Sequence, residues 1–195
     1  MRSTQPPEGT ALPDLPVDSP GPGFPIPSHY RWCVACGADH PWGLHLQMST
    51  SVGLSVVGTF TVGVHHQGSP GLAHGGVLAT AMDEALGYLN WVMGTPAVTA
   101  RLEVDYRAPA PVGSVLYLHA EIIGARGRKI YCRGSGRIGS DEGPVAIEVR
   151  ALFVQVPISH FLQAGNQQII QEAIQDRAKG APSWLADGEA IELSP

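Results

Sequence analysis

The sequence predicts an α+β domain in which one long buried helix lies against a curved antiparallel sheet. Residues 75–93 contain no proline and are rich in Ala, Leu and Met, and their apolar positions follow the i, i+3, i+4 spacing of a buried helix. Four strand-like runs follow without another helix, separated by short turns rich in Gly and Pro. Strands joined by short turns pair antiparallel, because parallel pairing needs a long crossover. We therefore expect the sheet to curl round the helix.

Each predicted strand is a short run in which apolar and polar residues alternate or β-branched residues are frequent. Two runs precede the helix and four follow it: residues 44–48, 55–62, 97–107, 115–123, 129–138 and 145–156. The helix is expected to stop at Gly94-Thr95-Pro96, because proline cannot donate the hydrogen bond that a helix interior requires.

Three parts of the chain differ in composition. Residues 1–30 are Pro-rich, since eight of the 17 prolines fall before position 28, and this predicts a disordered arm. Residues 31–156 hold the helix and the strands and form the predicted domain. Residues 157–195 carry apolar residues at mixed helical spacings, followed by Gly180 and Pro182, which predicts one or two short helices and a loose tail.

The composition limits the classes of function. Of the 195 residues 44% are hydrophobic, which is enough for a core, and the formal net charge is −5. An acidic chain has no general attraction for phosphate backbones, so we expect no nucleic-acid partner. No apolar run approaches the roughly 20 residues of a membrane span, and the first 30 residues hold no secretory signal. Three cysteines, an odd number, fit a reducing compartment, so we expect a cytoplasmic protein.

His74-Gly75-Gly76 stands where the helix is expected to begin, and Asp83 follows inside the helix. Glycines let a ligand approach the backbone closely, and the first amides of a helix are unpaired donors, so this segment has the properties of an oxyanion hole. Burial in an apolar helix makes an unused Asp83 carboxylate costly. The alternative is a plain loop followed by a solvated Asp83-Glu84 stripe. Neighbouring acids on a helix point about 100° apart, so at most one can face a given site.

Five runs of the sequence carry a resemblance to a known family: WCVACGADHPWGL, HGGVLATAMDEALG, VTARLEVDYRAPAPVGSVL, GARGRKIYC and VAIEVRALFV. Together they cover about residues 33–156 and resemble the hotdog-fold acyl-CoA thioesterases, in particular the phenylacetate-pathway and thioesterase-superfamily-member types. The resemblance implies a hotdog fold whose subunits dimerise through their sheets, with a dimer of dimers left open. It also implies a metal-independent hydrolase of acyl-CoA thioesters, with no cofactor beyond the coenzyme A of the substrate.

The resemblance further implies roles for individual residues. The family has an acid nine residues after the His of His-Gly-Gly and a Ser or Thr sixteen residues beyond that acid, which here are Asp83 and Thr99. Asp83 is then the general base that activates water, or the nucleophile, and Thr99 orients the water or the carboxylate. The Gly75 amide holds the thioester oxygen, and His74 forms hydrogen bonds at the start of the helix.

Two further substrate contacts are expected before and at the helix start, from Gln67 and Gly76. Many relatives carry an Asn or Gln six residues before the His of His-Gly-Gly. This sequence has Gly68 at that position and Gln67 one residue earlier.

Helix geometry adds a requirement that does not depend on the resemblance. On a helix that begins near Gly75, Asp83 lies eight residues on, about 12 Å along the axis at 1.5 Å per residue. An oxyanion donor and a base that serve one carbonyl must each lie within about 3 Å of the reacting atoms. One helix cannot supply both, so we expect a homodimer whose sites combine Gly75 of one subunit with Asp83 of the other.

Five of the 12 Lys and Arg residues lie within residues 126–137, a concentration of positive charge in an acidic chain. Coenzyme A carries a diphosphate and a 3′-phosphate, so this segment is a candidate phosphate-binding site. We assign that role to Arg128 and Lys129, with Arg107 as a further member. The alternative is a solvated hairpin whose charges protect a strand edge, which we expect for Arg133 and Arg137.

Cys33 and Cys36 form a Cys-x-x-Cys pair, with His40 and His45 as candidates for further zinc ligands. These spacings fit no common zinc finger, and the sequence has no second Cys pair, so we expect no metal site.

Two other functions compete with hydrolysis. A hydratase or dehydratase on the same fold is disfavoured, because the sequence has no Asp-x4-His signature. A non-catalytic acyl-CoA-binding or regulatory module is the remaining alternative, because a fold does not determine a function. Asp83 and Thr99 together favour an enzyme, since binding alone does not need a buried carboxylate.

Overall fold

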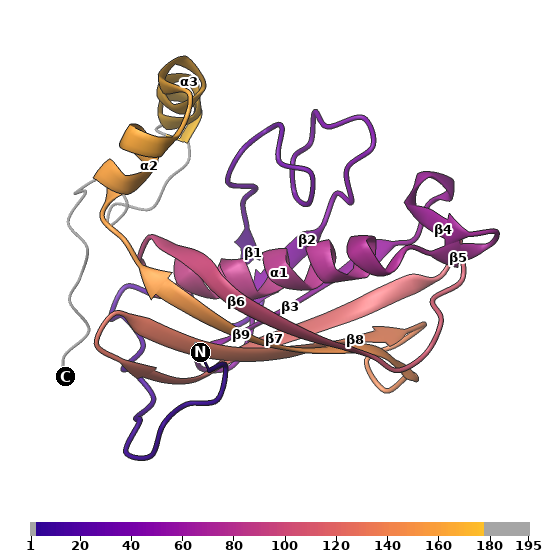
Figure 1. The fold of residues 1–195 in the computed structure, drawn as a ribbon, viewed down its shortest axis with the longest axis horizontal. Helices are drawn as coiled ribbons and strands as arrows, with labels where there is room; N and C mark the ends of the chain where they lie inside the picture. Colours follow the sequence, from indigo (N-terminus) through magenta and orange to yellow (C-terminus); the bar gives the residue numbers. More distant parts are fainter. Residues whose placement is uncertain (1–2, 178–195) are drawn as a thin grey trace.

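The computed structural model describes residues 3–177, which form a curved antiparallel sheet, a long helix, a small hairpin and two C-terminal helices (Figure 1). The strands are β1 Pro25–Ile26, β2 Gln47–Thr50, β3 Ser55–Thr61, β4 Gln67–Ser69, β5 Leu72–Ala73, β6 Ala97–Tyr106, β7 Val115–Arg126, β8 Lys129–Ile138 and β9 Val145–Gln155. The helices are the 3-10 turn Val64–His66, α1 Gly75–Val92, α2 Ile158–Ala164 and α3 Gln167–Arg177.

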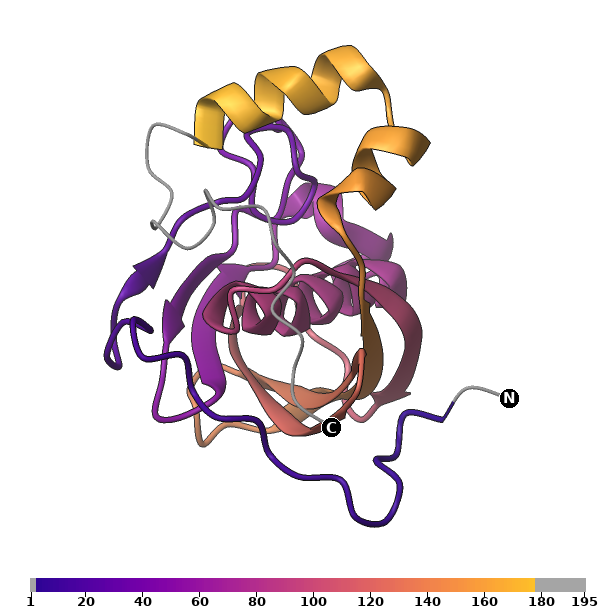
Figure 2. The same cartoon turned by 90° about the vertical axis from the view of Figure 1, so that its left-hand side faces the viewer.

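The main sheet curves round α1. Its strand order is β1-β2-β3-β7-β8-β9-β6, and the neighbouring strands pair antiparallel. Seen along its axis, α1 lies in the hollow of the curved sheet (Figure 2). This confirms the predicted α+β fold, in which an antiparallel sheet wraps one long central helix as in the hotdog fold. Among the described strands, β6 pairs with β9 alone and forms one edge of the sheet.

The apolar face of α1 is the centre of the core, because Met82, Leu86 and Leu89 are fully buried there. A glycine of β8 lets the helix approach the sheet closely. A Cβ at Gly134 would lie 2.8 Å from Met82 Cε and 2.7 Å from the carbonyl oxygen of His119. The space between α1 and β8 therefore has no room for a side chain at this position.

Replacing Gly134 with Ala is expected to lower the free energy of unfolding by about 1–3 kcal/mol, because overpacking displaces Met82 or the strand. Gly87→Ala is the matched control: its Cβ would meet nothing within 4 Å. Inside a helix, alanine is favoured over glycine by up to about 1 kcal/mol, so this control should be stabilised. Urea unfolding of both variants measures the two effects. A Gly134→Ala protein as stable as the parent chain would contradict the close packing described above.

The strand predicted over residues 44–48 begins later, since β2 is Gln47–Thr50. Leu44 and Leu46 are buried, but their N–H groups donate to the carbonyl oxygens of Val34 (2.9 Å) and Ala35 (3.0 Å). The alternating apolar residues here pair with a preceding loop and not with the sheet. A local pattern cannot distinguish these two partners.

The Pro-rich segment has defined contacts with the domain over residues 3–27, which differs from the disordered arm that the sequence predicts. β1 pairs with β2, Ala11 forms an isolated bridge with Ala125, and the hydroxyl of buried Thr4 donates to the Glu103 carboxylate on β6. The segment forms no helix, as its prolines predict. Because proline already restricts the unfolded backbone, ordering a Pro-rich segment costs less entropy than ordering another segment of the same length. Few contacts are therefore enough to hold it.

α2 and α3 follow β9, where the sequence predicts one or two short helices. The predicted loose tail lies almost entirely outside the described residues. None of the described helices has both the length and the apolar character needed to cross a membrane.

Candidate active site

Asp83 on α1 and Thr99 on β6 are in direct contact. The Thr99 hydroxyl donates a hydrogen bond of 2.9 Å to Asp83 Oδ1. The pairing of β6 with β9 is irregular between Thr99 and Arg101, and irregularities of this kind redirect side chains beside functional sites. The fold thus brings together two candidate residues that lie sixteen positions apart in the sequence.

The surroundings of Asp83 suit a group that takes up a proton. Burial raises the pKa of its carboxyl above the ordinary value, and the hydrogen bond from Thr99 partly offsets this by lowering it. A carboxylate with a raised pKa is a stronger base than an exposed one. Thr99 is exposed in the single chain, so a substrate can reach the pair.

His74 caps the N-terminus of α1. Its Nδ1 accepts a hydrogen bond from the Gly76 N–H (2.9 Å), and its own N–H donates to the His66 carbonyl oxygen (2.7 Å). The Gly76 amide is therefore engaged by the cap. The Gly75 N–H belongs to the first helical turn, whose amides have no acceptor within the helix. The geometry leaves Gly75 as the amide that can receive an oxyanion.

Tyr106, at the end of β6, contacts the start of α1 and has no role in the sequence prediction. Its hydroxyl donates to the Gly75 carbonyl oxygen (2.9 Å). A Cβ on Gly75 would lie 3.2–3.3 Å from atoms of the Tyr106 side chain, so glycine allows this contact. The strand register places Tyr106 here, and no local pattern in the sequence indicates it.

The two halves of the candidate site lie apart in one chain. Gly75 adjoins Tyr106, the last residue of β6, whereas Asp83 adjoins Thr99 near the first residue of β6. The eight-residue separation on α1 corresponds to about 12 Å along the helix axis. A single chain therefore does not bring the Gly75 amide and the Asp83 carboxylate to one carbonyl group.

Gln67 is occupied within its own turn. Its side-chain amide donates to the Val64 carbonyl oxygen (2.8 Å) and accepts from the Gly71 N–H (2.6 Å), which closes the segment that joins β4 to β5. A Cβ at Gly68 would lie 2.9–3.1 Å from His74, so glycine lets this turn pack against the helix cap. These contacts give Gln67 and Gly68 a structural role that requires no substrate.

Arg107 is paired at the end of β6. Its guanidinium lies 2.8 Å from the Glu148 carboxylate and 3.7 Å from that of Asp105. The neighbouring acids compete with any phosphate for this side chain, which makes Arg107 a weaker candidate than the sequence implies.

Arg128 and Lys129 are exposed in and beside the turn between β7 and β8, and neither forms an ion pair within residues 3–177. Arg133, by contrast, is paired with Glu121 (2.7 Å). Strand register places Ile130 in one row with Phe153 and Thr99. The Arg128–Lys129 turn therefore lies at the same end of the sheet as Thr99.

Glu84 has a different partner from Asp83, as the 100° separation of neighbouring helix positions predicts. Its carboxylate lies 3.1 Å from His29 Nδ1. Cys33 and Cys36 also lie beside it. The sequence prediction contains no role for His29 or Glu84, because the fold alone brings them to the cysteines.

Part of the chain is similar to known thioesterases. Residues 70–145 match the model of the thioesterase superfamily. The chain is 33% identical over 101 residues to the acyl-coenzyme A thioesterase THEM4 of Rattus norvegicus, a match that covers 52% of this chain and 43% of that protein. The chain thus spans less than half the length of this relative.

Solved structures share the fold. The thioesterase superfamily protein RHA08564 is 33% identical with a TM-score of 0.59, over 64% of this chain and 60% of that one. A hypothetical thioesterase of Streptococcus pneumoniae TIGR4, solved with coenzyme A, is 22% identical with a TM-score of 0.50, over 52% of this chain and 78% of that one. The pneumococcal protein has also been solved with an Asp and, separately, with a Thr sixteen positions further on replaced by Ala.

Proposed function

We propose that the protein hydrolyses the thioester bond of an acyl-CoA to a free acid and coenzyme A, since its residues 70–145 match the thioesterase superfamily. The hydrogen bond between Thr99 and Asp83 Oδ1 supports this most directly. It holds a half-buried carboxylate on the central helix at a position that a substrate can reach. The Asp and Thr replaced in the pneumococcal variants have the same spacing, which also favours a shared function for the pair.

Asp83 activates the attacking oxygen in this proposal. As a general base, it takes a proton from water while the water oxygen bonds to the thioester carbon. As a nucleophile, its own oxygen forms that bond, and water then cleaves the resulting anhydride. In both routes the C–S bond breaks, and the sulfur leaves with the electron pair and is protonated to the thiol of coenzyme A. Thr99 orients the carboxylate, and the Gly75 N–H donates to the carbonyl oxygen as negative charge builds on it.

The proposed active unit is a homodimer built on β6. This strand is ten residues long and forms an edge of the sheet, and long unpaired edges favour pairing with another strand. Antiparallel pairing of two β6 strands about a two-fold axis sets the end of one strand beside the start of the other. Gly75 and Tyr106 of one subunit then lie near Asp83 and Thr99 of its partner. In this proposal, dimerisation brings the Gly75 amide and the Asp83 carboxylate to one carbonyl group, which a single chain does not do.

Release of free thiol from a panel of acyl-CoAs tests the activity, with acyl groups from acetyl to palmitoyl and aryl acids included. We expect at least one member to be hydrolysed above the rate without protein, and the acyl preference follows from the same panel. Binding of acyl-CoA without thiol release from any member would instead support a non-catalytic acyl-CoA-binding module.

Arg128 and Lys129 are proposed to bind the phosphates of coenzyme A. Replacing both with Ala is expected to raise KM for acyl-CoA about 5-fold at low ionic strength, since two exposed ion pairs contribute about 0.5 kcal/mol each. The increase should shrink at high salt, which screens these contacts, and kcat should change little. Arg133→Ala, which removes a residue already paired with Glu121, is the control. An equal KM increase for a short thioester without a nucleotide would exclude phosphate binding.

A further inference from the structure

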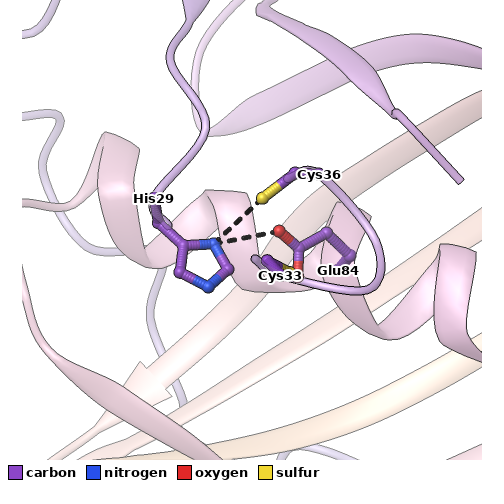
Figure 3. Close-up of side chains that lie close together, drawn as sticks. All are labelled: His29, Cys33, Cys36 and Glu84. Carbon is purple, nitrogen blue, oxygen red and sulfur yellow. Dashed lines mark hydrogen bonds and ion pairs between the residues drawn. The ribbon is translucent and has the colours of Figure 1, made fainter. Parts of the chain in front are cut away.

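Four side chains with metal-ligating atoms meet where the loop before β2 reaches the middle of α1 (Figure 3). They are His29, Cys33, Cys36 and Glu84, called here the His29–Glu84 cluster. One ligand atom from each residue lies within 4.8 Å of the other three. The first three residues come from the loop and Glu84 comes from α1. The proposed hydrolysis uses none of them.

The separations between these atoms resemble the edges of a tetrahedron round one ion. His29 Nδ1 lies 3.1 Å from Glu84 Oε1 and 3.2 Å from Cys36 Sγ, and Cys33 Sγ lies 3.8 Å from Glu84 Oε2. Zinc bonds of about 2.0–2.1 Å to nitrogen or oxygen and about 2.3 Å to sulfur, at tetrahedral angles, separate the ligands by about 3.3–3.8 Å. These three separations differ from the tetrahedral values by a few tenths of an ångström, and all four ligand atoms lie within 4.8 Å of one another.

The backbone of the loop folds back tightly round Cys33. The Ala35 N–H donates to Cys33 Sγ (3.4 Å), and the Gly37 N–H donates to the Cys33 carbonyl oxygen (2.9 Å). A Cβ at Gly37 would lie 2.5–2.6 Å from backbone atoms of Arg31 and Cys33, so glycine is needed for the chain to fold back this tightly. N–H···S contacts of this kind orient ligand sulfurs in metal sites.

Two acceptors of the cluster share one imidazole nitrogen. His29 Nδ1 faces both Glu84 Oε1 and Cys36 Sγ, yet it carries at most one proton. Glu84 Oε1 is buried and lies 3.1 Å from His29 Nδ1, whereas Cys36 Sγ also has the Ser28 hydroxyl as a donor (3.3 Å). A proton on this nitrogen that points to the Cys36 sulfur leaves the buried carboxylate oxygen without a donor, which is costly. A cation between the four groups would satisfy this oxygen and both sulfurs together.

We propose that the His29–Glu84 cluster binds one Zn²⁺ through His29 Nδ1, the thiolates of Cys33 and Cys36, and one carboxylate oxygen of Glu84. Two thiolates with an imidazole and a carboxylate favour zinc over the hard cations Mg²⁺ and Ca²⁺. Four protein ligands leave no open position for a substrate, so the ion is structural. The ion links the loop to Glu84, the residue that follows Asp83 on the central helix. This link stabilises the orientation of the helix in which Asp83 faces Thr99.

This site departs from the absence of metal that the sequence predicts. The spacing of Cys33 and Cys36 draws attention to the nearby His40 and His45, but neither belongs to the cluster, and His40 Nδ1 instead accepts from the Trp42 N–H (3.3 Å). Glu84 lies 51 residues beyond Cys33 in the chain. No sequence motif joins residues at that distance.

The zinc content of the purified chain, kept under reducing conditions, tests the proposal. Plasma mass spectrometry is expected to find about one Zn²⁺ per chain. His29→Ala, Glu84→Gln and Cys36→Ser should each lower the zinc retained after dialysis against a weak chelator at least about 10-fold. Cys132→Ala and His40→Ala are matched controls that should retain it. His29 and Glu84 are 43% and 15% exposed, so their variants keep the test valid if Cys36→Ser does not fold.

Addition of Co²⁺ to the metal-free chain provides a second readout. A tetrahedral site with two thiolates should give a thiolate-to-cobalt charge-transfer band and intense visible d–d bands, which Zn²⁺ then abolishes. Loss of both bands in Cys36→Ser, but not in Cys132→Ala, is the expected result.

Three results would overturn the zinc site. One is a reduced chain that holds less than about a tenth of a zinc equivalent and takes up neither Zn²⁺ nor Co²⁺. Another is full zinc retention by both His29→Ala and Glu84→Gln. The third is a Cys33–Cys36 disulfide in the protein as isolated from a reducing cytosol. None of these measurements depends on thioester hydrolysis, so the zinc site and the proposed activity fail independently.

Discussion

Replacing Asp83 with Asn is expected to lower kcat for acyl-CoA hydrolysis at least about 100-fold, with little change in KM. Asparagine has the size of aspartate and still accepts the hydrogen bond that Thr99 donates to Asp83 Oδ1. The amide, however, neither takes a proton from water nor attacks the thioester carbon. Initial rates of thiol release at saturating substrate measure the loss.

Glu84→Gln is the control for Asp83→Asn, because Glu84 has His29 as its partner. Glu84→Gln should retain more activity than Asp83→Asn even if Glu84→Gln no longer binds zinc. A 100-fold loss in Glu84→Gln, together with normal turnover in Asp83→Asn, would mean that Glu84 and not Asp83 is the base.

The pH dependence of kcat/KM gives an independent check on Asp83. Burial raises the pKa of its carboxyl and the Thr99 hydrogen bond lowers it, so activity should fall with decreasing pH at a point above the ordinary carboxyl range of about 4. Thr99→Ala removes the hydrogen bond to the ionised form, which raises the pKa further. The acidic limb of that variant should therefore move to higher pH, with a smaller loss of kcat than in Asp83→Asn. An unmoved limb would show that Thr99 does not act on this carboxylate.

Two inactive variants are expected to restore activity to each other when their chains form mixed dimers. Gly75→Pro removes the amide proposed to bind the oxyanion, at the first helical position, where proline is tolerated. Asp83→Ala removes the carboxylate. A mixed dimer holds one site with both lesions and one site with the intact Gly75 and the intact Asp83. An equimolar mixture, unfolded and refolded, should recover about a quarter of the parent activity, since half the dimers are mixed and each has one good site of two.

Three controls make this result decisive. Gly75→Ala keeps the N–H and adds the same Cβ beside Tyr106, so it shows how much of the Gly75→Pro loss comes from crowding. A mixture of Asp83→Ala with Asp83→Asn should recover nothing, because both lesions lie in the same half of the site. Circular dichroism and differently tagged chains confirm folding and mixing. No recovery from folded, mixed dimers would mean that each site is built within one chain.

The sequence by itself determined the elements and their class. The predicted helix over residues 75–93 agrees with α1 (Gly75–Val92). A buried helix repeats every 3.6 residues, and neighbouring residues in the sequence are enough to show that period. The strands after it agree for the same reason, since alternation and turn glycines are local signals. The apolar helix round it indicates Asp83, the resemblance to the hotdog thioesterases implies Thr99, and the Thr99 hydroxyl lies 2.9 Å from Asp83 Oδ1.

Tertiary structure decided which distant segments meet. The buried Leu44 and Leu46 pair with a loop, and the Pro-rich residues 3–27 contact the sheet, although their composition predicts disorder. Tyr106 reaches Gly75 only because the register of β6 places it there. Composition and periodicity report whether a segment has an apolar face or a turn, but not which other segment covers it.

The His29–Glu84 cluster depends most on the tertiary structure. Its members come from a loop and from a helix far along the chain. Cys33 and Cys36 carry a local signal, because a tight turn brings them together. His29 and Glu84 carry none, because side chains on separate elements become ligands of one site only when packing orients both. Secondary structure depends on interactions between near neighbours in the chain, whereas a site depends on the free energy of packing the whole domain.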